Sequence, residues 1–181
     1  QAFGPFFFSV AGDREEAVSL VPRLFTYFLL AVSVVVLLIG LHAEVIIRLL
    51  GNPGYAGAAR VIPILASVYL FSPFIFVGSS QILYRKRSPV LVWIILAAGL
   101  LNLVLNVALI PAWGMMGAAV ATWLTYGGYA GLTWWWAQRL YPVPFEYGRL
   151  ARLFLITSAC LGAAAVLDGA AGLGGVVLRE G

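Results

Sequence analysis

Long apolar runs separated by short polar turns dominate the chain from end to end. A helix that crosses the hydrocarbon of a bilayer needs about 20 apolar residues, at about 1.5 Å per residue. Five runs approach that length, and the first four contain no Asp, Glu, Lys or Arg. A charge at the bilayer centre costs about 2.5–3.5 kcal/mol, so this absence fits burial in lipid. The pattern predicts an all-α polytopic transmembrane helix bundle, with spans near 24–41, 61–83, 90–110, 117–136 and 150–167.

The segments between these runs are too short for a soluble catalytic domain. Pro111 is predicted to stop the third span, so that 111–116 joins it to the fourth span as an antiparallel pair. The longest loop covers 137–149 and contains two prolines. Residues 1–11 are predicted to be the end of a truncated transmembrane helix, which makes the sequence a fragment. Residues 12–167 are predicted to form the transmembrane region, and 168–181 a glycine-rich tail or the end of the last span.

Composition supports a lipid environment and argues against several functions. Of the 181 residues, 62% are hydrophobic and 10% are charged, whereas an ordinary soluble domain carries about 25% charged residues. The net charge of +4 comes from basic residues scattered between apolar runs, which does not favour nucleic-acid binding. With one cysteine, Cys160, and one histidine, His42, neither a disulfide nor a metal site is predicted, and no cofactor is expected.

Basic residues are distributed unevenly between the two sides of the predicted bundle. If the span 24–41 runs outward, eight of the eleven basic residues lie on one side. The positive-inside rule assigns that side to the cytoplasm, and the tryptophans at 134–136 would lie at its interface. The cytoplasmic group is Arg14, Arg23, Arg85, Lys86, Arg87, Arg139, Arg149 and Arg152, and the opposite group is Arg48, Arg60 and Arg179.

The third span, its turn and the fourth span carry the strongest local pattern. Asn102 and Asn106 are four residues apart, so they share one helix face. Amides in hydrocarbon need partners, so the pair either holds two helices together or lines a transport path. Small residues after Pro111 would let the next helix pack closely; the packing positions are Gly114, Gly117, Ala118, Ala119, Ala121 and Thr122.

This stretch resembles the C-terminal region of the Wzx-type polysaccharide flippases of the multidrug/oligosaccharidyl-lipid/polysaccharide exporter superfamily. Their late "N-x-x-x-N … I-P … G-x-x-G-A-A-x-A-T" segment is matched by Asn102, Asn106, Ile110, Pro111, Gly114, Gly117, Ala118, Ala119, Ala121 and Thr122. An upstream turn of the family is similar to Leu49, Leu50 and Gly51 followed by Tyr55 and Ala58 or Ala59. A basic loop before the asparagine helix corresponds loosely to 85–88.

The resemblance implies the C-terminal lobe of a two-lobe MATE-like transporter whose N-terminal lobe is missing from this sequence. It further implies that the protein flips undecaprenyl-diphosphate-linked oligosaccharide by alternating access in the bacterial cytoplasmic membrane, for polysaccharide biosynthesis. Expected partners are the lipid-linked oligosaccharide, membrane lipids, the missing lobe and a polysaccharide polymerase. Candidates for the substrate path are Asn102, Asn106, Gln81, Tyr126 and the cluster Arg85, Lys86 and Arg87, which serves either the diphosphate or topology alone.

Two further expectations complete the sequence-based hypothesis. Pro63 and Pro73 lie inside the second predicted span, where they either kink it for gating or pack statically. The alternatives to a flippase are a drug or metabolite antiporter of the same superfamily and a membrane-embedded glycosyl or acyl transferase. An antiporter needs acidic residues within the spans, and a transferase needs convergent acids or histidines at a membrane face. The chain offers neither pattern clearly, so no enzymatic activity is predicted.

Overall fold

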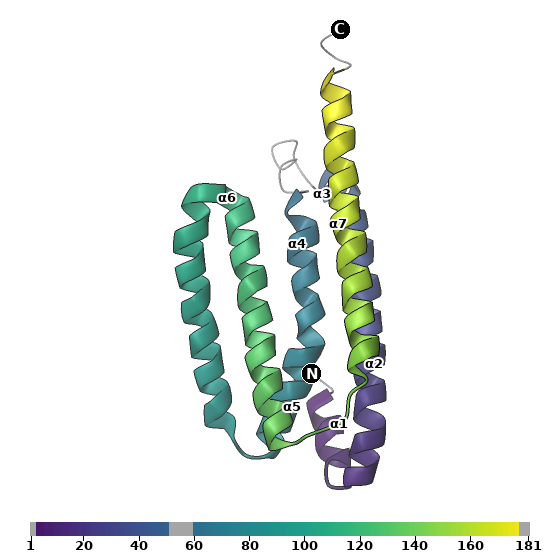
Figure 1. Cartoon of the computed structure of the whole chain (residues 1–181), viewed down its shortest axis with the longest axis vertical. Helices are drawn as coiled ribbons and strands as arrows, with labels where there is room; N and C mark the ends of the chain where they lie inside the picture. Colours follow the sequence, from purple (N-terminus) through teal and green to yellow (C-terminus); the bar gives the residue numbers. More distant parts are fainter. Residues whose placement is uncertain (1–2, 51–59, 178–181) are drawn as a thin grey trace.

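The computed structural model describes residues 3–50 and 60–177, with side-chain detail except at Phe3, Glu44, Arg48, Leu50 and 164–177. Every regular element in these ranges is a helix (Figure 1). Three helical stretches of the described chain are long and apolar enough to cross a membrane: Arg14–Leu41, Ile62–Tyr84 and Ser88–Leu140. The predicted all-α helix bundle is confirmed. Its elements are α1 (Phe3–Val10), α2 (Arg14–Leu41), α3 (Ala43–Leu50), α4 (Ile62–Ser67), the 3₁₀ helix η2 (Val68–Phe71), α5 (Ser72–Tyr84), α6 (Ser88–Leu140) and α7 (Tyr147–Val177).

Some sequence-based expectations concern residues outside the ranges that the structure describes. Within the upstream motif, Gly51, Tyr55, Ala58 and Ala59 lie outside the described residues. Arg179 of the predicted outer basic group lies outside them as well.

Helix α2 starts well before its apolar run because Asp13 caps it. The Asp13 side chain accepts hydrogen bonds from the backbone N–H groups of Glu15 (2.9 Å) and Glu16 (3.3 Å). An acceptor at this position satisfies donors that the first turn leaves free, and acidic residues there complement the helix dipole. The buried residues of α2 recur every three or four positions and form one stripe: Ala17, Val21, Phe25, Leu29, Ser33, Val36 and Gly40.

The second predicted span is interrupted near its middle. Helix α4 is followed directly by η2 and then by α5, so the α-helical hydrogen-bond pattern is lost over Val68–Phe71. Pro63 lies in the first turn of α4, where its missing N–H has no intrahelical partner to lose. In this position Pro63 fits the alternative of static packing, and its role in gating stays a prediction. Pro73 lies in the first turn of α5, next to the interruption.

Helix α6 consists of two antiparallel arms, 88–113 and 115–140, which reverse at Gly114 (Figure 1). The helix continues through Pro111, so the prediction that Pro111 stops the span is wrong. Near the end of an arm, proline removes one backbone hydrogen bond without forcing the chain to turn. Gly114 makes the turn with φ 56° and ψ −131°, a conformation open to glycine alone.

The predicted packing residues near this turn have different roles. A Cβ at Gly114 would meet nothing within 4 Å, so this glycine serves the backbone turn and not helix packing. A Cβ at Gly117 would overlap the carbonyl oxygen of Leu109 and lie 2.6 Å from its carbonyl carbon. The two arms therefore approach backbone to backbone at Gly117. Beyond it, Ala119 is buried, and the Thr122 hydroxyl donates to the Ala118 carbonyl (2.9 Å).

The last helix is longer than its apolar run. Helix α7 begins at Tyr147 and its backbone stays helical to Val177. The helix therefore includes Asp168 and the glycines that follow it. From the sequence, this segment was expected to be either a tail or the end of the last span.

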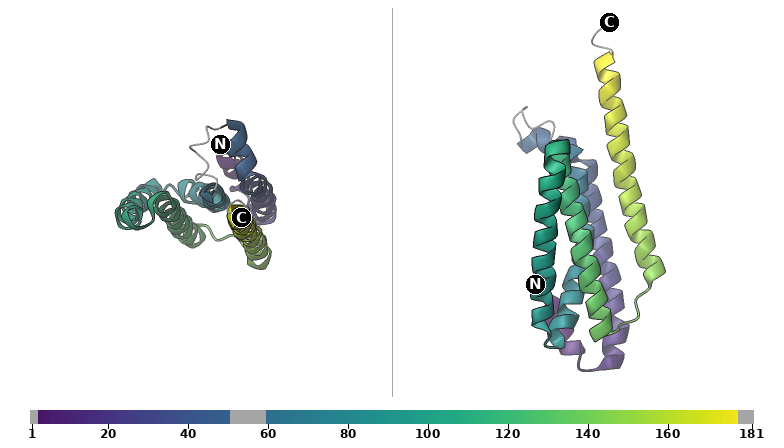
Figure 2. Two further views of the ribbon diagram at one scale, coloured as in Figure 1. Left: turned by 90° about the horizontal axis from the view of Figure 1, so that it is seen from above. Right: turned by 60° about the vertical axis from the view of Figure 1, so that its left-hand side comes forward.

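The helices form an open arrangement with distinct edges. Helices α2 and α7 run in the same direction and touch where Gly40 meets the side chain of Leu161. Helix α5 packs against the second arm of α6, where a Cβ at Gly78 would lie 3.0 Å from Thr133 Cγ2. Figure 2 shows the first arm of α6 at the outer edge of the bundle. Its apolar side chains are exposed there, for example Trp93 at 72% and Val107 at 69%.

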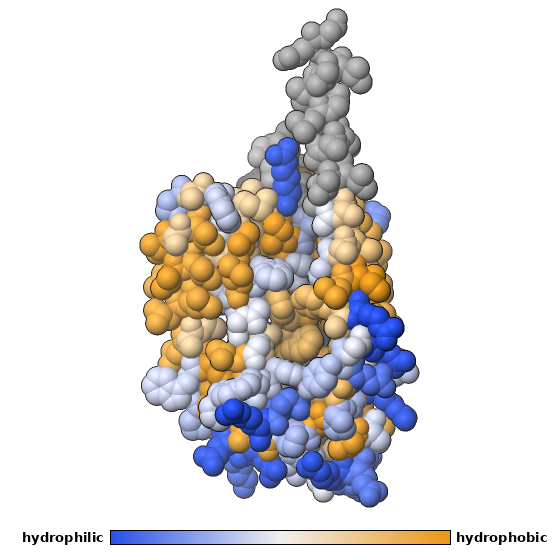
Figure 3. Space-filling model, in the orientation of Figure 1, coloured by the Kyte–Doolittle hydropathy of each residue, from blue (hydrophilic) through white to orange (hydrophobic). Residues whose placement is uncertain are grey.

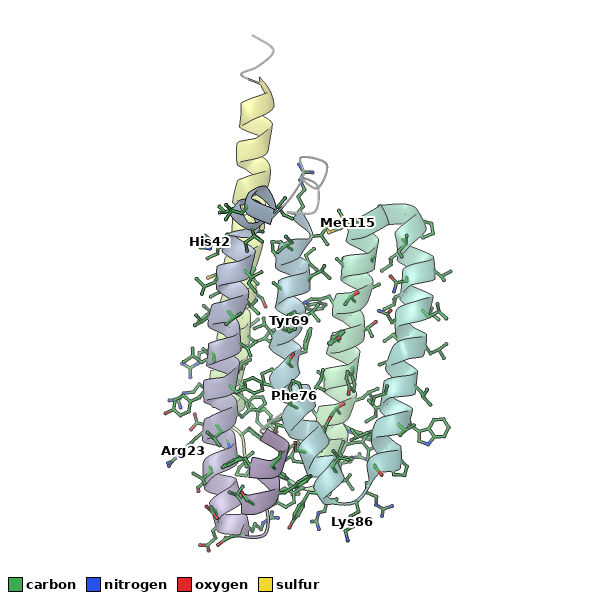
Figure 4. All side chains as sticks on the ribbon, turned by 180° about the vertical axis from the view of Figure 1, so that it is seen from behind. Arg23, His42, Tyr69, Phe76, Lys86 and Met115 are labelled. Carbon is green, nitrogen blue, oxygen red and sulfur yellow. The ribbon has the colours of Figure 1, made fainter. Side chains whose placement is uncertain are left out.

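Polar residues gather at one end of the bundle (Figure 3). We call this the basic end; it carries the starts of α2, α6 and α7 and the ends of α5 and α6. Figure 4 shows Arg23 and Lys86 toward this end, and His42 and Met115 toward the other. The eight basic residues assigned to one side by the sequence belong to these helix ends: Arg14, Arg23, Arg85, Lys86, Arg87, Arg139, Arg149 and Arg152.

Candidate functional site

An open groove of about 860 Å³ runs between α2, the interrupted span and the second arm of α6. We call it the tyrosine groove. Figure 4 shows two of its residues, Tyr69 and Phe76, between α2 and α6 and well away from both ends of the bundle. It therefore lies at the depth of the hydrocarbon if the long helices cross a membrane. Its lining is Phe28, Ala31, Val32, Val35, Val36, Ile39, Ile62, Leu65, Ala66, Tyr69, Ser72, Ile75, Phe76, Tyr126 and Tyr129.

The polar atoms of this lining are hydroxyl groups. They belong to Tyr69, Ser72, Tyr126 and Tyr129, and the described lining contains no charged side chain. The Tyr129 hydroxyl lies near the side chain of Ser79. Tyr69 and Tyr126 are 63% and 41% exposed, and their hydroxyls make no hydrogen bond within the described residues. A hydroxyl that faces hydrocarbon without a partner costs free energy, so these two groups need a partner in the membrane.

The 3₁₀ segment η2 brings two of these hydroxyls together. A 3₁₀ helix has three residues per turn, so side chains three positions apart are eclipsed. Tyr69 and Ser72 have this spacing and both line the groove. The Ser72 N–H donates to the Tyr69 carbonyl, and Pro73 has no N–H to restore the α-helical pattern. The interruption therefore determines which side chains face the groove.

Asn102 and Asn106 connect the two arms of α6. Asn102 Nδ2 donates to the Thr125 hydroxyl of the second arm (3.1 Å), and Asn106 Nδ2 donates to Asn102 Oδ1 (2.9 Å). All three residues lie outside the groove lining, although Thr125 is followed by Tyr126. The structure thus supplies an interhelical contact for the asparagines. A direct role in the transport path stays a prediction.

Gln81 lies in the protein interior and not in the groove. Its side chain is fully buried, and Nε2 donates to the carbonyl of Tyr141 (3.0 Å). This bond ties α5 to the residue that follows α6. Gln81 is absent from the groove lining, so its role in the transport path stays a prediction.

The basic turn after α5 has a defined backbone shape. The Lys86 N–H donates to the Leu83 carbonyl (2.8 Å), and the Arg87 N–H donates to the Ile82 carbonyl (3.2 Å). With Lys86 at φ 55°, these bonds form a Schellman motif, in which a left-handed residue ends the helix. Arg85 Nε donates to the carbonyl of Leu140 (2.9 Å), so this arginine also caps α6.

Tyr141 organises the basic end of the bundle. Its hydroxyl donates to the Ala11 carbonyl (3.2 Å), and the guanidinium groups of Arg14 and Arg85 lie 5.9 and 5.5 Å from its ring centre. Burial raises the pKa of Tyr141, as does neighbouring Tyr84, while the two arginines oppose the shift. The three basic residues 85–87 are all exposed, and within the described residues Arg85 differs in that its side chain bonds to the Leu140 carbonyl.

Comparison with known proteins shows similarity to a membrane protein. The "Uncharacterized membrane protein MJ1068" of Methanocaldococcus jannaschii is 33% identical to this chain over 106 residues, which is 59% of the chain. The same residues are 21% of that protein, so the chain spans about a fifth of the length of the curated relative it matches. No protein-family model matches the sequence. No solved structure matches it.

Similarity to a membrane protein agrees with the long apolar helices of the described chain. It supports a location in a membrane. The family suggested by the asparagine and glycine motif gains no separate support from the comparison.

The groove also contains residues that the sequence reasoning missed. Tyr126 was among the predicted path residues, and it does line the groove; Tyr69 and Tyr129 were not predicted. A usable signal existed, because tyrosines stood inside uncharged runs where a hydroxyl is unfavourable without a partner. The interruption at η2, which turns Tyr69 and Ser72 to the same side, could not be predicted from the sequence.

Proposed function

We propose that this chain belongs to a flippase that carries an undecaprenyl-diphosphate-linked oligosaccharide across the cytoplasmic membrane by alternating access. The observation that carries the proposal is the tyrosine groove, an uncharged, hydroxyl-bearing hollow at membrane depth. The family resemblance of the 102–122 segment supports the same activity. Because the chain spans about a fifth of its relative, the activity is proposed for the whole protein.

The groove suits a substrate with a hydrocarbon tail and a neutral polar head. Apolar walls of Val, Ile, Leu and Phe let an isoprenoid chain remain in an apolar environment. Sugar hydroxyls, in contrast, need hydrogen-bond partners at that depth, and Tyr69 and Tyr126 offer donors that nothing in the described chain uses. Carboxylates for coupling to protons or sodium are absent from the described lining, which favours the flippase over the antiporter alternative.

Alternating access also needs an element that can bend, and the interrupted span provides one. A stretch of 3₁₀ helix within a long helix often marks a hinge, because its hydrogen bonds are poorer than those of an α-helix. Here the 3₁₀ segment lies on the groove wall beside Pro73. We expect the rest of the protein, including the missing lobe, to form the opposite wall. A polysaccharide polymerase would accept the flipped product.

Substitution of the groove hydroxyls tests the proposal. In the full-length protein, Tyr69→Phe with Tyr126→Phe removes two hydroxyls and leaves both rings in place. Each lost hydrogen bond to a sugar is worth about 0.5–1.5 kcal/mol, so loss of both should lower export roughly 5- to 150-fold. Glycan display at the cell surface is the readout, with membrane protein level measured in parallel. Tyr147→Phe is the matched control, since Tyr147 is 54% exposed and lies outside the groove.

A second test fills the groove with a large side chain instead of removing hydroxyl groups. Ala31→Trp would fill part of the hollow, whereas Ala97→Trp puts the same side chain on the exposed first arm of α6. We expect Ala31→Trp to stop export at normal protein level and Ala97→Trp to leave it unchanged. Loss of folded protein with Ala31→Trp alone would show that another part of the protein packs into the groove. That result, or normal export from both groove variants, overturns the assignment.

A further inference from the structure

A small pocket between α2 and α7 brings two arginines together from distant parts of the sequence. Its volume is about 90 Å³, and its lining is Pro22, Arg23, Thr26, Tyr27, Glu146 and Arg149. Arg149 Nη1 pairs with Glu146 Oε2 at 2.7 Å. Arg23 makes no ion pair or hydrogen bond within the described residues, so its guanidinium is available. The pocket thus holds two positive charges against one negative charge.

Both arginines are placed at the boundary between hydrocarbon and headgroups. Arg23 directly precedes the uncharged run that starts at Leu24, and Arg149 directly precedes Leu150 at the start of the α7 run. Because α2 and α7 run in the same direction, these boundaries lie at one end of the bundle, where Figure 3 shows hydrophilic residues gathered. Figure 4 shows Arg23 on the flank of the bundle, above the level of Lys86.

We propose that this pocket binds the phosphate group of an anionic membrane phospholipid. A guanidinium donates several fixed hydrogen bonds and suits phosphate better than a point charge does. Tyr27 lines the same pocket and is 68% exposed, so its hydroxyl adds a donor that a ligand can reach. The site is on a different face of α2 from the tyrosine groove, so it is independent of the proposed transport path.

Glu146 acts as a built-in competitor in this site. Its carboxylate occupies the Arg149 guanidinium, although both side chains are 64% exposed. An exposed ion pair contributes at most about 1 kcal/mol, so a phosphate can displace it. Removal of the Glu146 charge should therefore strengthen lipid binding by roughly two- to fivefold.

Lipid-dependent stability of the purified full-length protein tests the proposal. The protein in detergent is titrated with short-chain phosphatidylglycerol, phosphatidylcholine or inorganic phosphate, and its thermal midpoint is followed. We expect stabilisation by phosphatidylglycerol alone, with about tenfold weaker apparent affinity in Arg23→Gln with Arg149→Gln. Lys86→Gln with Arg87→Gln removes the same charge at the basic end, outside the pocket, and should bind as the wild type does.

Variants of two acidic residues test lipid binding even if the double arginine variant is unstable. Glu146→Gln should bind phosphatidylglycerol more tightly, whereas Glu16→Gln, an exposed acid at the same end, should not. Equal effects from these two variants, or equal losses from the two double variants, would indicate a general charge effect and overturn the site. Stabilisation by phosphatidylcholine or by free phosphate to the same degree would overturn the assignment to an anionic lipid.

Discussion

The reversal of α6 depends on a glycine whose replacement has a calculable effect. At Gly117, an alanine Cβ would overlap the Leu109 carbonyl oxygen, lie 2.6 Å from the carbonyl carbon and lie 3.1 Å from the Ile110 nitrogen. All three are backbone atoms, so no flexible side chain can move aside. Overpacking in a well-packed interior costs typically about 1–3 kcal/mol, and contact with rigid backbone places Gly117→Ala near the upper value. The two arms would have to separate at the turn.

The assay is the thermal midpoint of the purified full-length protein in detergent, read as loss of the monodisperse species after heating. Gly99→Ala and Gly131→Ala serve as matched controls on the two arms, because a Cβ at either position meets nothing within 4 Å. Alanine is favoured over glycine within a helix by about 0.8–1.0 kcal/mol, so the controls should be neutral or slightly stabilising. A Gly117→Ala protein as stable as these controls would refute the close approach of the arms.

Two further predictions concern polar side chains of the bundle. Asn102→Leu with Asn106→Leu removes the bond to Thr125 and should lower the stability of the bundle by about 0.6–2 kcal/mol while leaving insertion intact. Export should fall, and normal glycan display would exclude a transport role for the pair. The raised pKa of Tyr141 means that the folded state holds this proton more tightly, so stability is present below the ordinary value and is lost as pH rises through the folded-state pKa. Tyr141→Phe should therefore flatten the decline in thermal midpoint above about pH 10, and an identical decline in both proteins would contradict this cause.

The spans were predictable because lipid imposes a simple rule on composition. A chain that must satisfy its backbone in hydrocarbon forms helices, and charged residues are kept out of them. Three stretches of the described chain meet this rule, and the stretch that forms α6 contains two of the predicted spans. The clustering of basic residues at one end follows from the same spacing of apolar runs.

Local geometry was harder to predict, because it depends on contacts between segments. Proline at 111 suggested a stop, yet the chain turns at Gly114, where only glycine has the required backbone freedom. Pro63 suggested a kink but lies in a first turn, where proline is accommodated. Gln81 is a polar residue inside an apolar run, like Tyr126, but only packing decides that Gln81 bonds to a carbonyl while Tyr126 faces the groove.

The bond between Asn102 and Thr125 has a consequence for synthesis of the chain. The two residues are separated by 23 positions, and ribosomes add roughly 5–20 residues per second, so Thr125 is made about 1–5 s after Asn102. During that interval Asn102 Nδ2 lacks the partner that the second arm gives it in the described structure. The local bond from Asn106 Nδ2 to Asn102 Oδ1 can form as soon as that turn of helix exists, so the Asn102 side-chain oxygen has its partner before the second arm arrives.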